Sequence, residues 1–158
     1  MLIPIYDASD IHILVVDDKP SNLRLLNEIL PQKGFYAHPV PNANLALATL
    51  ERVKIDLILL DILMPEVDGY TLCQIIKENP KIKHIPVIFI TAIDEILDRG
   101  KAFTVGGEGY ITKPFHFQEL FTCIDLHLER HWLRQKLLEL APDLLAPVVD
   151  GENPANSQ

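Results

Sequence analysis

The stretch from Asp56 to Gly69, DLILLDILMPEVDG, constrains the fold more than any other part of the chain. Residues Leu57 to Leu60 are all apolar, without the alternation expected of a strand that has one face in water. Such a run predicts a strand buried on both faces of a parallel sheet. It ends on a carboxylate, Asp61, which is costly to place beside a buried strand unless a cation or a lysine lies near it. Asp61 is therefore the first candidate functional residue.

Other segments of the chain repeat this alternation of a short apolar run with a helical pattern. The further strands are predicted at Ile11–Val16, Phe35–Val40, Pro86–Ile90 and Tyr110–Thr112. Helical patterns are predicted from Pro20 to Gly34, at about Tyr70–Glu78 with Leu72, Ile75 and Ile76 facing inward, at Asp94–Thr104 and from His116 onward. A further helix is predicted up to Val53, with Asn42 or Asn44 as its N-terminal cap. Strand–helix alternation predicts an α/β fold, a doubly wound parallel sheet with helices on both faces. Pro39 and Pro41 place the second strand at a sheet edge.

The 158 residues fit one domain with modest extensions. We expect an N-terminal lead-in at 1–10, a folded domain at 11–128, an extension of the last helix at 129–140, and a proline- and polar-rich, disordered tail at 141–158. No internal repeat and no helix-turn-helix for DNA binding is found in this order of elements.

Composition narrows the function classes. With 14 Lys and Arg against 22 Asp and Glu, the net charge of −8 argues against direct nucleic-acid binding. The cysteines, Cys73 and Cys123, lie in apolar helical patterns and are expected to be reduced core residues. The sequence shows no secretion signal and no run of membrane-spanning length, so we expect a cytoplasmic protein without membrane contact.

Polar residues end several predicted strands. Asp17 and Asp18 follow the first strand, and Asp61, Thr91 and Lys113 end the third, fourth and fifth. Since the carboxyl ends of parallel strands share one sheet edge, these side chains are expected to converge. Crowded carboxylates repel one another, and Mg²⁺ with oxygen ligands would relieve that repulsion. A lysine and a hydroxyl group beside them suit a phosphoryl group, so the pattern indicates an aspartate that accepts phosphate with Mg²⁺.

At these residues the sequence resembles a response-regulator receiver domain of two-component signalling, a chemotaxis-receiver-like fold. The resemblance covers about Ile11 to Leu128. It is carried by VVDD at Val15–Asp18, LLDILMPEVDGY at Leu59–Tyr70, ITA at Ile90–Ala92 and GYITKPF at Gly109–Phe115. It implies a flavodoxin-like sheet of five strands in the order 2-1-3-4-5.

The resemblance also implies a role for each site residue. Asp61 would be the phosphoacceptor, and Asp18, Asp61 and the backbone carbonyl of Leu63 would bind Mg²⁺. Asp17 would hold a metal-bound water. Lys113 would bind the phosphoryl oxygens beside a cis bond to Pro114.

The same resemblance implies a conformational switch, and it also shows where this sequence departs from the family pattern. On phosphorylation, Thr91 would move toward the phosphoryl group and Tyr110 would turn inward, which reshapes an interaction surface. Leu63 and Ile93, two residues past Asp61 and Thr91, are both apolar, so we expect slow self-dephosphorylation. Gly109 stands where an acidic residue is common and is expected to loosen the fifth strand.

The partners implied are a sensor histidine kinase or phosphotransfer protein as donor and an unidentified output protein. The domain would be a phosphoacceptor module and not a turnover enzyme. Two alternatives stay open. The first is a Mg²⁺-dependent aspartyl-phosphate phosphohydrolase, although such enzymes carry two acids one residue apart and not adjacent as in Asp17-Asp18. The second is a receiver fragment of a larger hybrid kinase or multidomain regulator.

The last helix carries two apolar stripes. One is expected to pack on the sheet and contains Phe117, Leu120, Phe121, Ile124 and Leu128. The other falls on the opposite face and contains Leu126, Leu133, Leu137 and Leu140. It is either a frayed amphipathic end or, as we favour, a coiled-coil seam that joins two copies into a homodimer. The histidines show no metal-binding spacing, and the glycines at 106–109 are read as a turn and not as a phosphate loop.

Overall fold

The computed structural model describes residues 10–92 and 99–144, with only the backbone described at Arg99. Its centre is a five-stranded parallel sheet in the order β2-β1-β3-β4-β5. The strands are β1 (His12–Val16), β2 (Tyr36–Val40), β3 (Leu57–Leu60), β4 (Val87–Ala92) and β5 (Gly109–Lys113). The predicted flavodoxin-like sheet and its strand order are confirmed.

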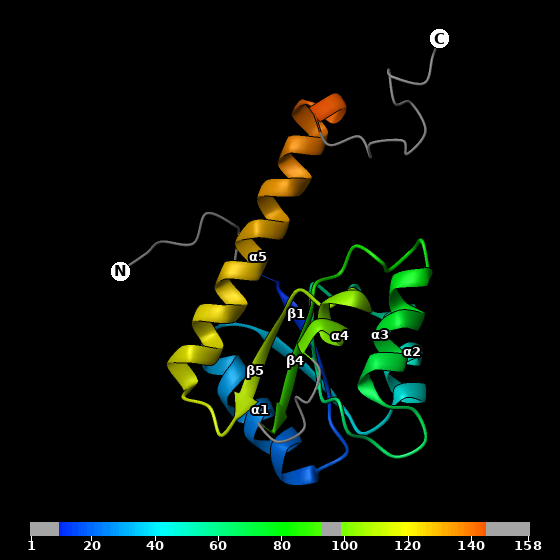
Figure 1. Ribbon diagram of the computed structural model, residues 1–158. Helices are drawn as coiled ribbons and strands as arrows, with labels where there is room; N and C mark the ends of the chain where they lie inside the picture. Colours follow the sequence, from blue (N-terminus) through cyan, green and yellow to red (C-terminus); the bar gives the residue numbers. More distant parts are fainter. Residues whose placement is uncertain (1–9, 93–98, 145–158) are drawn as a thin grey trace.

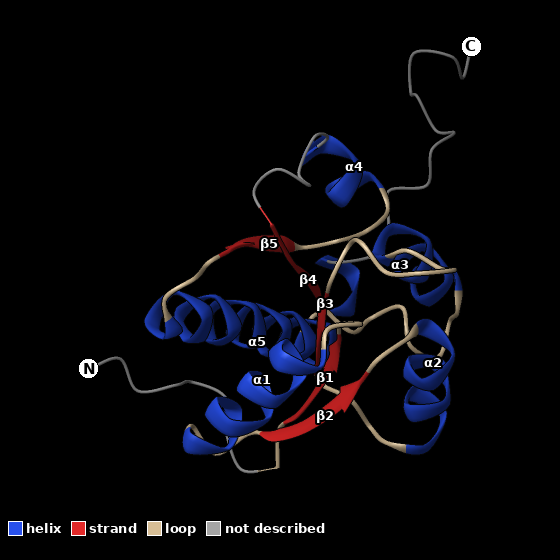
Figure 2. Cartoon of the chain, turned by 90° about the horizontal axis from the view of Figure 1, so that it is seen from below, coloured by secondary structure: helices blue, strands red, loops and turns tan. Residues whose placement is uncertain are grey.

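Helices cover both faces of the sheet. They are α1 (Pro20–Gln32), α2 (Ala43–Arg52), α3 (Gly69–Glu78), α4 (Arg99–Thr104) and α5 (Phe117–Leu140). Figure 2 shows α1 and α5 on one face and α2 and α3 on the other. The predicted start of the fourth helix at Asp94 lies outside the described residues.

The continuous apolar run of β3 has a direct structural reason. Ile58 and Leu60 belong to the core beneath α2 and α3, whereas Leu57 and Leu59 belong to the core beneath α1 and α5. All four side chains are almost fully buried. Because successive strand residues point to opposite faces, a strand with a core on each face has no polar position.

The predicted position of the second strand at a sheet edge and the predicted cap of the second helix are confirmed, and a further cap is found at α3. β2, which contains Pro39, is an edge strand. Asn42, one of two candidate caps, accepts a hydrogen bond from the backbone N–H of Leu45 at 2.9 Å. Asp68 caps α3 in the same way, through the backbone N–H of Thr71 at 2.8 Å.

Two residues expected to face inward do not. Ile75 is 40% exposed because the buried face of α3 is formed by Leu72, Cys73 and Ile76, and Ile75 lies to one side of it. Phe117 is 47% exposed because it is the first residue of α5, before the helix reaches the sheet. The remaining members of its stripe pack on the sheet as expected: Leu120, Ile124 and Leu128 are buried, and Phe121 packs against the same core.

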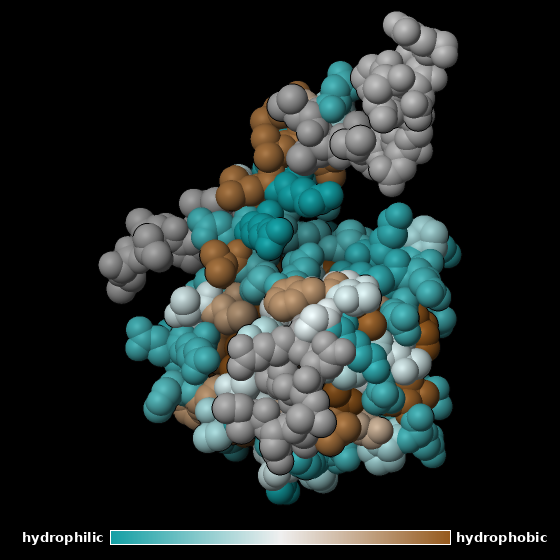
Figure 3. Space-filling model, in the orientation of Figure 1, coloured by the Kyte–Doolittle hydropathy of each residue, from teal (hydrophilic) through white to brown (hydrophobic). Residues whose placement is uncertain are grey.

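The last helix continues well beyond the sheet (Figure 1). Its second stripe is exposed, with 59% of Leu126, 44% of Leu133, 46% of Leu137 and 82% of Leu140 accessible. In Figure 3, hydrophobic side chains gather along this projecting part. Pro142–Leu144 form a short 3-10 helix where disorder was expected to begin. The rest of the expected tail and the lead-in at 1–9 lie outside the described residues.

Within the described part of the chain, no helix combines the length and the apolar character needed to cross a membrane. Cys73 is buried and Cys123 is half-buried, and neither forms a disulfide.

Candidate functional site

The residues predicted from the strand ends lie at the carboxyl edge of the sheet. Asp17 and Asp18 directly follow β1, and Asp61 directly follows β3, where its backbone N–H bonds to the carbonyl of Val16 at 2.9 Å. Thr91 is near the end of β4 and fully buried. Lys113 is the last residue of β5. The sheet order places β4 between the strands that carry Asp61 and Lys113.

Three carboxylates meet at this edge. Asp17, Asp18 and Asp61 each offer an oxygen atom, and these oxygens lie within 4.8 Å of one another. The residues Asp17 and Asp61 are each only 3% exposed. Such a cluster of carboxylate oxygens could hold a divalent cation.

Lys113 supplies positive charge to the cluster. Its Nζ atom lies 3.0 Å from Oδ2 of Asp17 and 3.7 Å from Oδ2 of Asp61. The Lys113-Pro114 peptide bond is cis, as the resemblance implied. The amine of Lys113, which belongs to β5, therefore reaches across the end of β4 to the two buried carboxylates.

The carboxylate of Asp17 is held from several directions. Its Oδ1 accepts the backbone N–H of Lys19 at 2.9 Å, and its Oδ2 accepts Nδ2 of Asn22 at 3.0 Å in addition to Lys113. Sequence reasoning did not single out Asn22. The available signal was its place in the first turn of the helix that follows the acidic pair.

Asp18 differs from its neighbour. Its Oδ1 atom is buried and has no hydrogen-bond partner among the described residues. A buried carboxylate oxygen without a donor is costly, and a cation at this position would remove the cost. This orphaned oxygen shows that the residues present fit a bound metal.

The loop after β3 is packed tightly under Asp61. The backbone N–H of Gly69 bonds to the carbonyl of Ile62 at 2.7 Å, and a side chain at Gly69 would collide with the backbone carbonyl of Asp61. The glycine is therefore needed for this close approach. Within the same loop Leu63 is 54% exposed, so an apolar side chain stands in solvent two residues past Asp61.

Tyr110 lies on β5 within reach of α4. It is half-buried against the core beneath α2 and α3, and its ring meets that of Phe103 edge-on, with centroids 6.2 Å apart. Gly109, just before it, pairs with Ile88 in the sheet, and the ring of His127 occupies the space that a side chain would take. Ile93, the other apolar departure, lies outside the described residues.

Comparisons with known proteins agree with this geometry. The family model for the response regulator receiver domain matches residues 13–125. The heme response regulator HssR of Staphylococcus epidermidis is 36% identical over 121 residues, which cover 77% of this chain and 53% of that protein. The response regulator PleD of Caulobacter vibrioides is 40% identical over 112 residues, 71% of this chain and 25% of PleD. The chain thus spans about half of the length of HssR.

Solved structures give the same result. The receiver domain of a signal transduction histidine kinase from Syntrophus aciditrophicus has a TM-score of 0.66 and 35% identity, over 76% of this chain and 88% of that one. A CheY-like receiver domain protein from Methanospirillum hungatei has a TM-score of 0.74 and 25% identity, over 80% of this chain and 99% of that one. This chain belongs to the response regulator receiver domain family of two-component signalling.

Proposed function

We propose that Asp61 accepts a phosphoryl group from a phosphohistidine on a sensor histidine kinase or phosphotransfer protein. A carboxylate oxygen of Asp61 forms a bond to phosphorus as the phosphorus–nitrogen bond breaks, and the donor leaves as a neutral imidazole after taking up a proton. The position of Lys113 Nζ, 3.0 Å from Asp17 and 3.7 Å from Asp61, carries the proposal. Its charge is placed to bind the phosphoryl oxygens during transfer.

Asp18, Asp61 and the backbone carbonyl of Leu63 would hold Mg²⁺, which neutralises charge on the phosphoryl oxygens when it is bound. Asp17 would position a metal-bound water. The hydrogen bonds support this division, because the oxygens of Asp17 already accept three donors whereas Oδ1 of Asp18 has none.

The signal would leave the site through Thr91 and Tyr110. Thr91 is fully buried on the strand between Asp61 and Lys113, so its hydroxyl can turn toward a phosphoryl group only with a shift of its surroundings. Tyr110, half-buried beside Phe103, could then take a more buried position. The surface formed by α4, β5 and α5 would change and bind an output protein, without direct nucleic-acid contact.

A second copy of the chain is our proposed partner for the projecting part of α5. Leu126, Leu133 and Leu140 recur every seven residues, and Leu137 lies four residues past Leu133, which is heptad spacing. Three of these leucines, Leu126, Leu133 and Leu137, line an exposed groove of about 430 Å³. On an isolated helix this apolar stripe stays in contact with water, which is unfavourable, whereas a homodimer would bury it.

The protein would act in the cytoplasm as a phosphoacceptor module and not as a turnover enzyme. The phosphohydrolase alternative is disfavoured by the adjacent acids Asp17-Asp18 and by a nucleophile on the third strand. A receiver within a larger regulator fits the greater length of the relatives.

The test is phosphorylation by acetyl phosphate with Mg²⁺, followed by intact mass measurement. We expect one phosphoryl group per chain, and none for Asp61→Asn. Asp68→Asn is the matched control: Asp68 is a nearby acid that caps α3, and asparagine caps equally well, so labelling should persist. Labelling of Asp61→Asn would refute the assignment, and continuous release of phosphate at enzymatic rates would favour the hydrolase.

A further inference from the structure

A second polar cavity lies at the opposite end of the sheet from Asp61. It has a volume of about 460 Å³ and lies between α5 and the loop that leads from α3 to β4. Its polar lining includes Lys83, His84, Glu108, Arg130, His131 and Arg134. None of these residues takes part in the phosphoacceptor site, and this inference does not rest on the proposed function.

The charge of this cavity is opposite to that of the whole protein. Lys83, Arg130 and Arg134 line it in a chain with 22 acidic and 14 basic residues. None of the three forms an ion pair with a described carboxylate. The single acid of the lining, Glu108, lies 3.8 Å from Nδ1 of His127, whose pKa is raised to about 9. At neutral pH that acid is therefore largely offset, and the cavity keeps a net positive charge.

Hydrogen bonds from the protein itself hold the loop that forms one wall of the cavity. Nζ of Lys77 donates to the carbonyls of Lys83 at 3.0 Å and Ile85 at 2.6 Å, which fixes the loop that carries Lys83 and His84. The ring of His84 stacks on that of His131 from α5, with centroids 5.9 Å apart. The loop and the projecting helix thus meet through two imidazoles.

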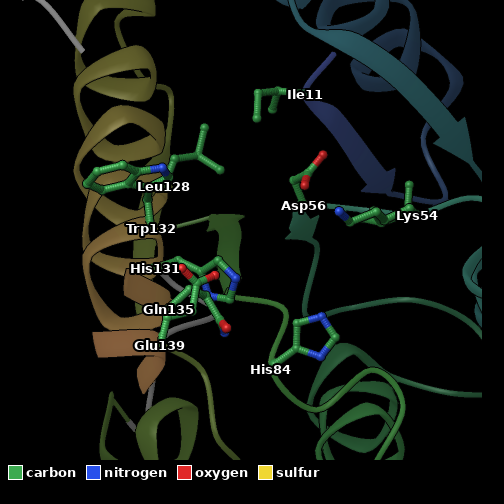
Figure 4. Close-up of a pocket in the computed structure, with 10 residues that line it drawn as sticks. Ile11, Lys54, Asp56, His84, Leu128, His131, Trp132, Gln135 and Glu139 are labelled. Carbon is green, nitrogen blue, oxygen red and sulfur yellow. The ribbon is translucent and has the colours of Figure 1, made fainter. Parts of the chain in front are cut away.

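A second hollow, lined by both charged and apolar side chains, adjoins the basic one. It has a volume of about 530 Å³ and shares His84, His131 and Gln135 with it. Figure 4 shows Trp132 and Leu128 on its helix wall, with Ile11 and Asp56 on the side of the sheet. Together the two hollows offer a basic end and a neighbouring space that is lined by the indole of Trp132 and aliphatic groups on one part and by the carboxylates of Asp56 and Glu139 on another.

We propose that this double cavity binds a small organic phosphate, with the phosphate on Lys83, Arg130 and Arg134 and the organic part toward Trp132. Guanidinium groups bind phosphate in a bidentate manner, and an ammonium adds a point charge. A concave site of this size suits a small molecule better than a flat protein surface. Bound there, the ligand would join α5 to the α3–β4 loop.

The two imidazoles would serve as neutral hydrogen-bond donors. Burial lowers the pKa of both His84 and His131, and the neighbouring imidazole of His84 lowers that of His131 further. Each ring then carries one N–H at neutral pH, which can be donated to a phosphate oxygen.

The probe is inorganic pyrophosphate, added to ¹⁵N-labelled full-length protein without Mg²⁺ and at constant ionic strength. Amide shifts at 83–85 and 130–135 should change and saturate. Arg130→Gln with Arg134→Gln should weaken binding by about tenfold or more, as expected for lost charge-assisted hydrogen bonds. Lys136→Gln removes one positive charge from the same helix at a residue that does not line the cavity, and binding should change by less than about twofold.

Ribose 5-phosphate then tests the organic part: it should bind more tightly than inorganic phosphate and shift the indole N–H of Trp132. Circular dichroism of each variant shows that the fold is kept. Shifts that grow without saturation, that occur only near Asp61 and Lys113, or that are the same in the double arginine variant would overturn the proposal.

Discussion

Gly109 and His127 fit together so closely that no side chain can be added at position 109 without moving the imidazole. A Cβ atom on Gly109 would lie 2.8 Å from Nε2 and 3.4 Å from Cε1 of His127. His127 is only 8% exposed on α5, and Gly109 is fixed in β5 by its pairing with Ile88. The absence of a side chain at position 109 therefore lets the imidazole of α5 pack directly against β5, the strand that carries Tyr110.

Gly109→Ala should destabilise the fold through this contact. Overpacking of a buried site costs about 1–3 kcal/mol, and we expect a loss in this range in the free energy of unfolding. Urea denaturation measures it. In a His127→Ala background the same change should cost less than about 0.5 kcal/mol, since the ring is gone. Equal costs in both backgrounds would show that the clash is not the cause.

The stability of the protein should depend on pH through His127. Interaction with Cys123 and with the carboxylate of Glu108 raises the pKa of His127 from 6.5 to about 9, although burial opposes the change. A raised pKa means that the folded state binds the proton more tightly than the unfolded state. The stabilisation is thus fully present below pH 6.5 and is lost as pH rises through about 9.

This contribution is obtained by comparing the wild type with His127→Gln across that range, because titrating groups that do not interact with His127 cancel in the difference. The advantage of the wild type should fall with rising pH by an amount on the order of 1–3 kcal/mol. A difference that stays constant between pH 6 and pH 10, on either side of the two pKa values, would show that His127 carries no such charge in the folded protein.

The sequence predicted the sheet and the cluster of acids because both depend on local patterns. A strand that is apolar on both faces, such as Leu57–Leu60, belongs to a sheet covered on both sides. Residues that follow parallel strands, such as Asp18 and Asp61, share an edge whatever the details of packing. The burial of Ile75 and Phe117 was predicted incorrectly, because the period of a helix does not show where its contact with the sheet begins.

Other features depend on contacts between distant residues. The fit of Gly109 to His127 and the stacking of His84 on His131 join segments whose approach is set by the position of α5 on the sheet. No local pattern records that position. The same is true of the cavity between α5 and the α3–β4 loop, since its basic residues are widely separated along the chain.

Lys113→Gln should destabilise the metal-free protein and increase its response to Mg²⁺. The substitution leaves Asp17 and Asp61 buried without their cation, and loss of one partner of a buried ion pair costs about 2 kcal/mol or more. A bound Mg²⁺ replaces the missing charge, so the variant should gain more stability than the wild type from added MgCl₂. Urea denaturation with and without Mg²⁺ measures both effects, with the exposed Lys81→Gln as control. An equal response to Mg²⁺ in both proteins would contradict the electrostatic role of Lys113.

The leucines on the outer face of α5 should control the oligomeric state. Leu133→Gln with Leu137→Gln removes the centre of the proposed seam, and sedimentation analysis should show a shift from dimer to monomer. A chain cut after Arg130 should behave in the same way. Leu45→Gln is the control, because Leu45 is as exposed as Leu137, at 46%, but lies on α2. Dimers that persist in both altered chains, or a monomeric wild type, would refute the seam.

The phosphorylated protein should lose its phosphoryl group slowly. Leu63 is 54% exposed two residues past Asp61, and an apolar side chain there offers no hydrogen bond to orient a water for attack on the acyl phosphate. After removal of the phosphodonor, intact mass measured over time should give a half-life of minutes or longer. Leu63→Asn supplies a polar group and should shorten the half-life severalfold, by about two- to tenfold, whereas Leu45→Asn, on a remote surface, should leave it unchanged. A wild-type half-life of seconds, or equal decay of Leu63→Asn and the wild type, would show that the residue does not limit access of water.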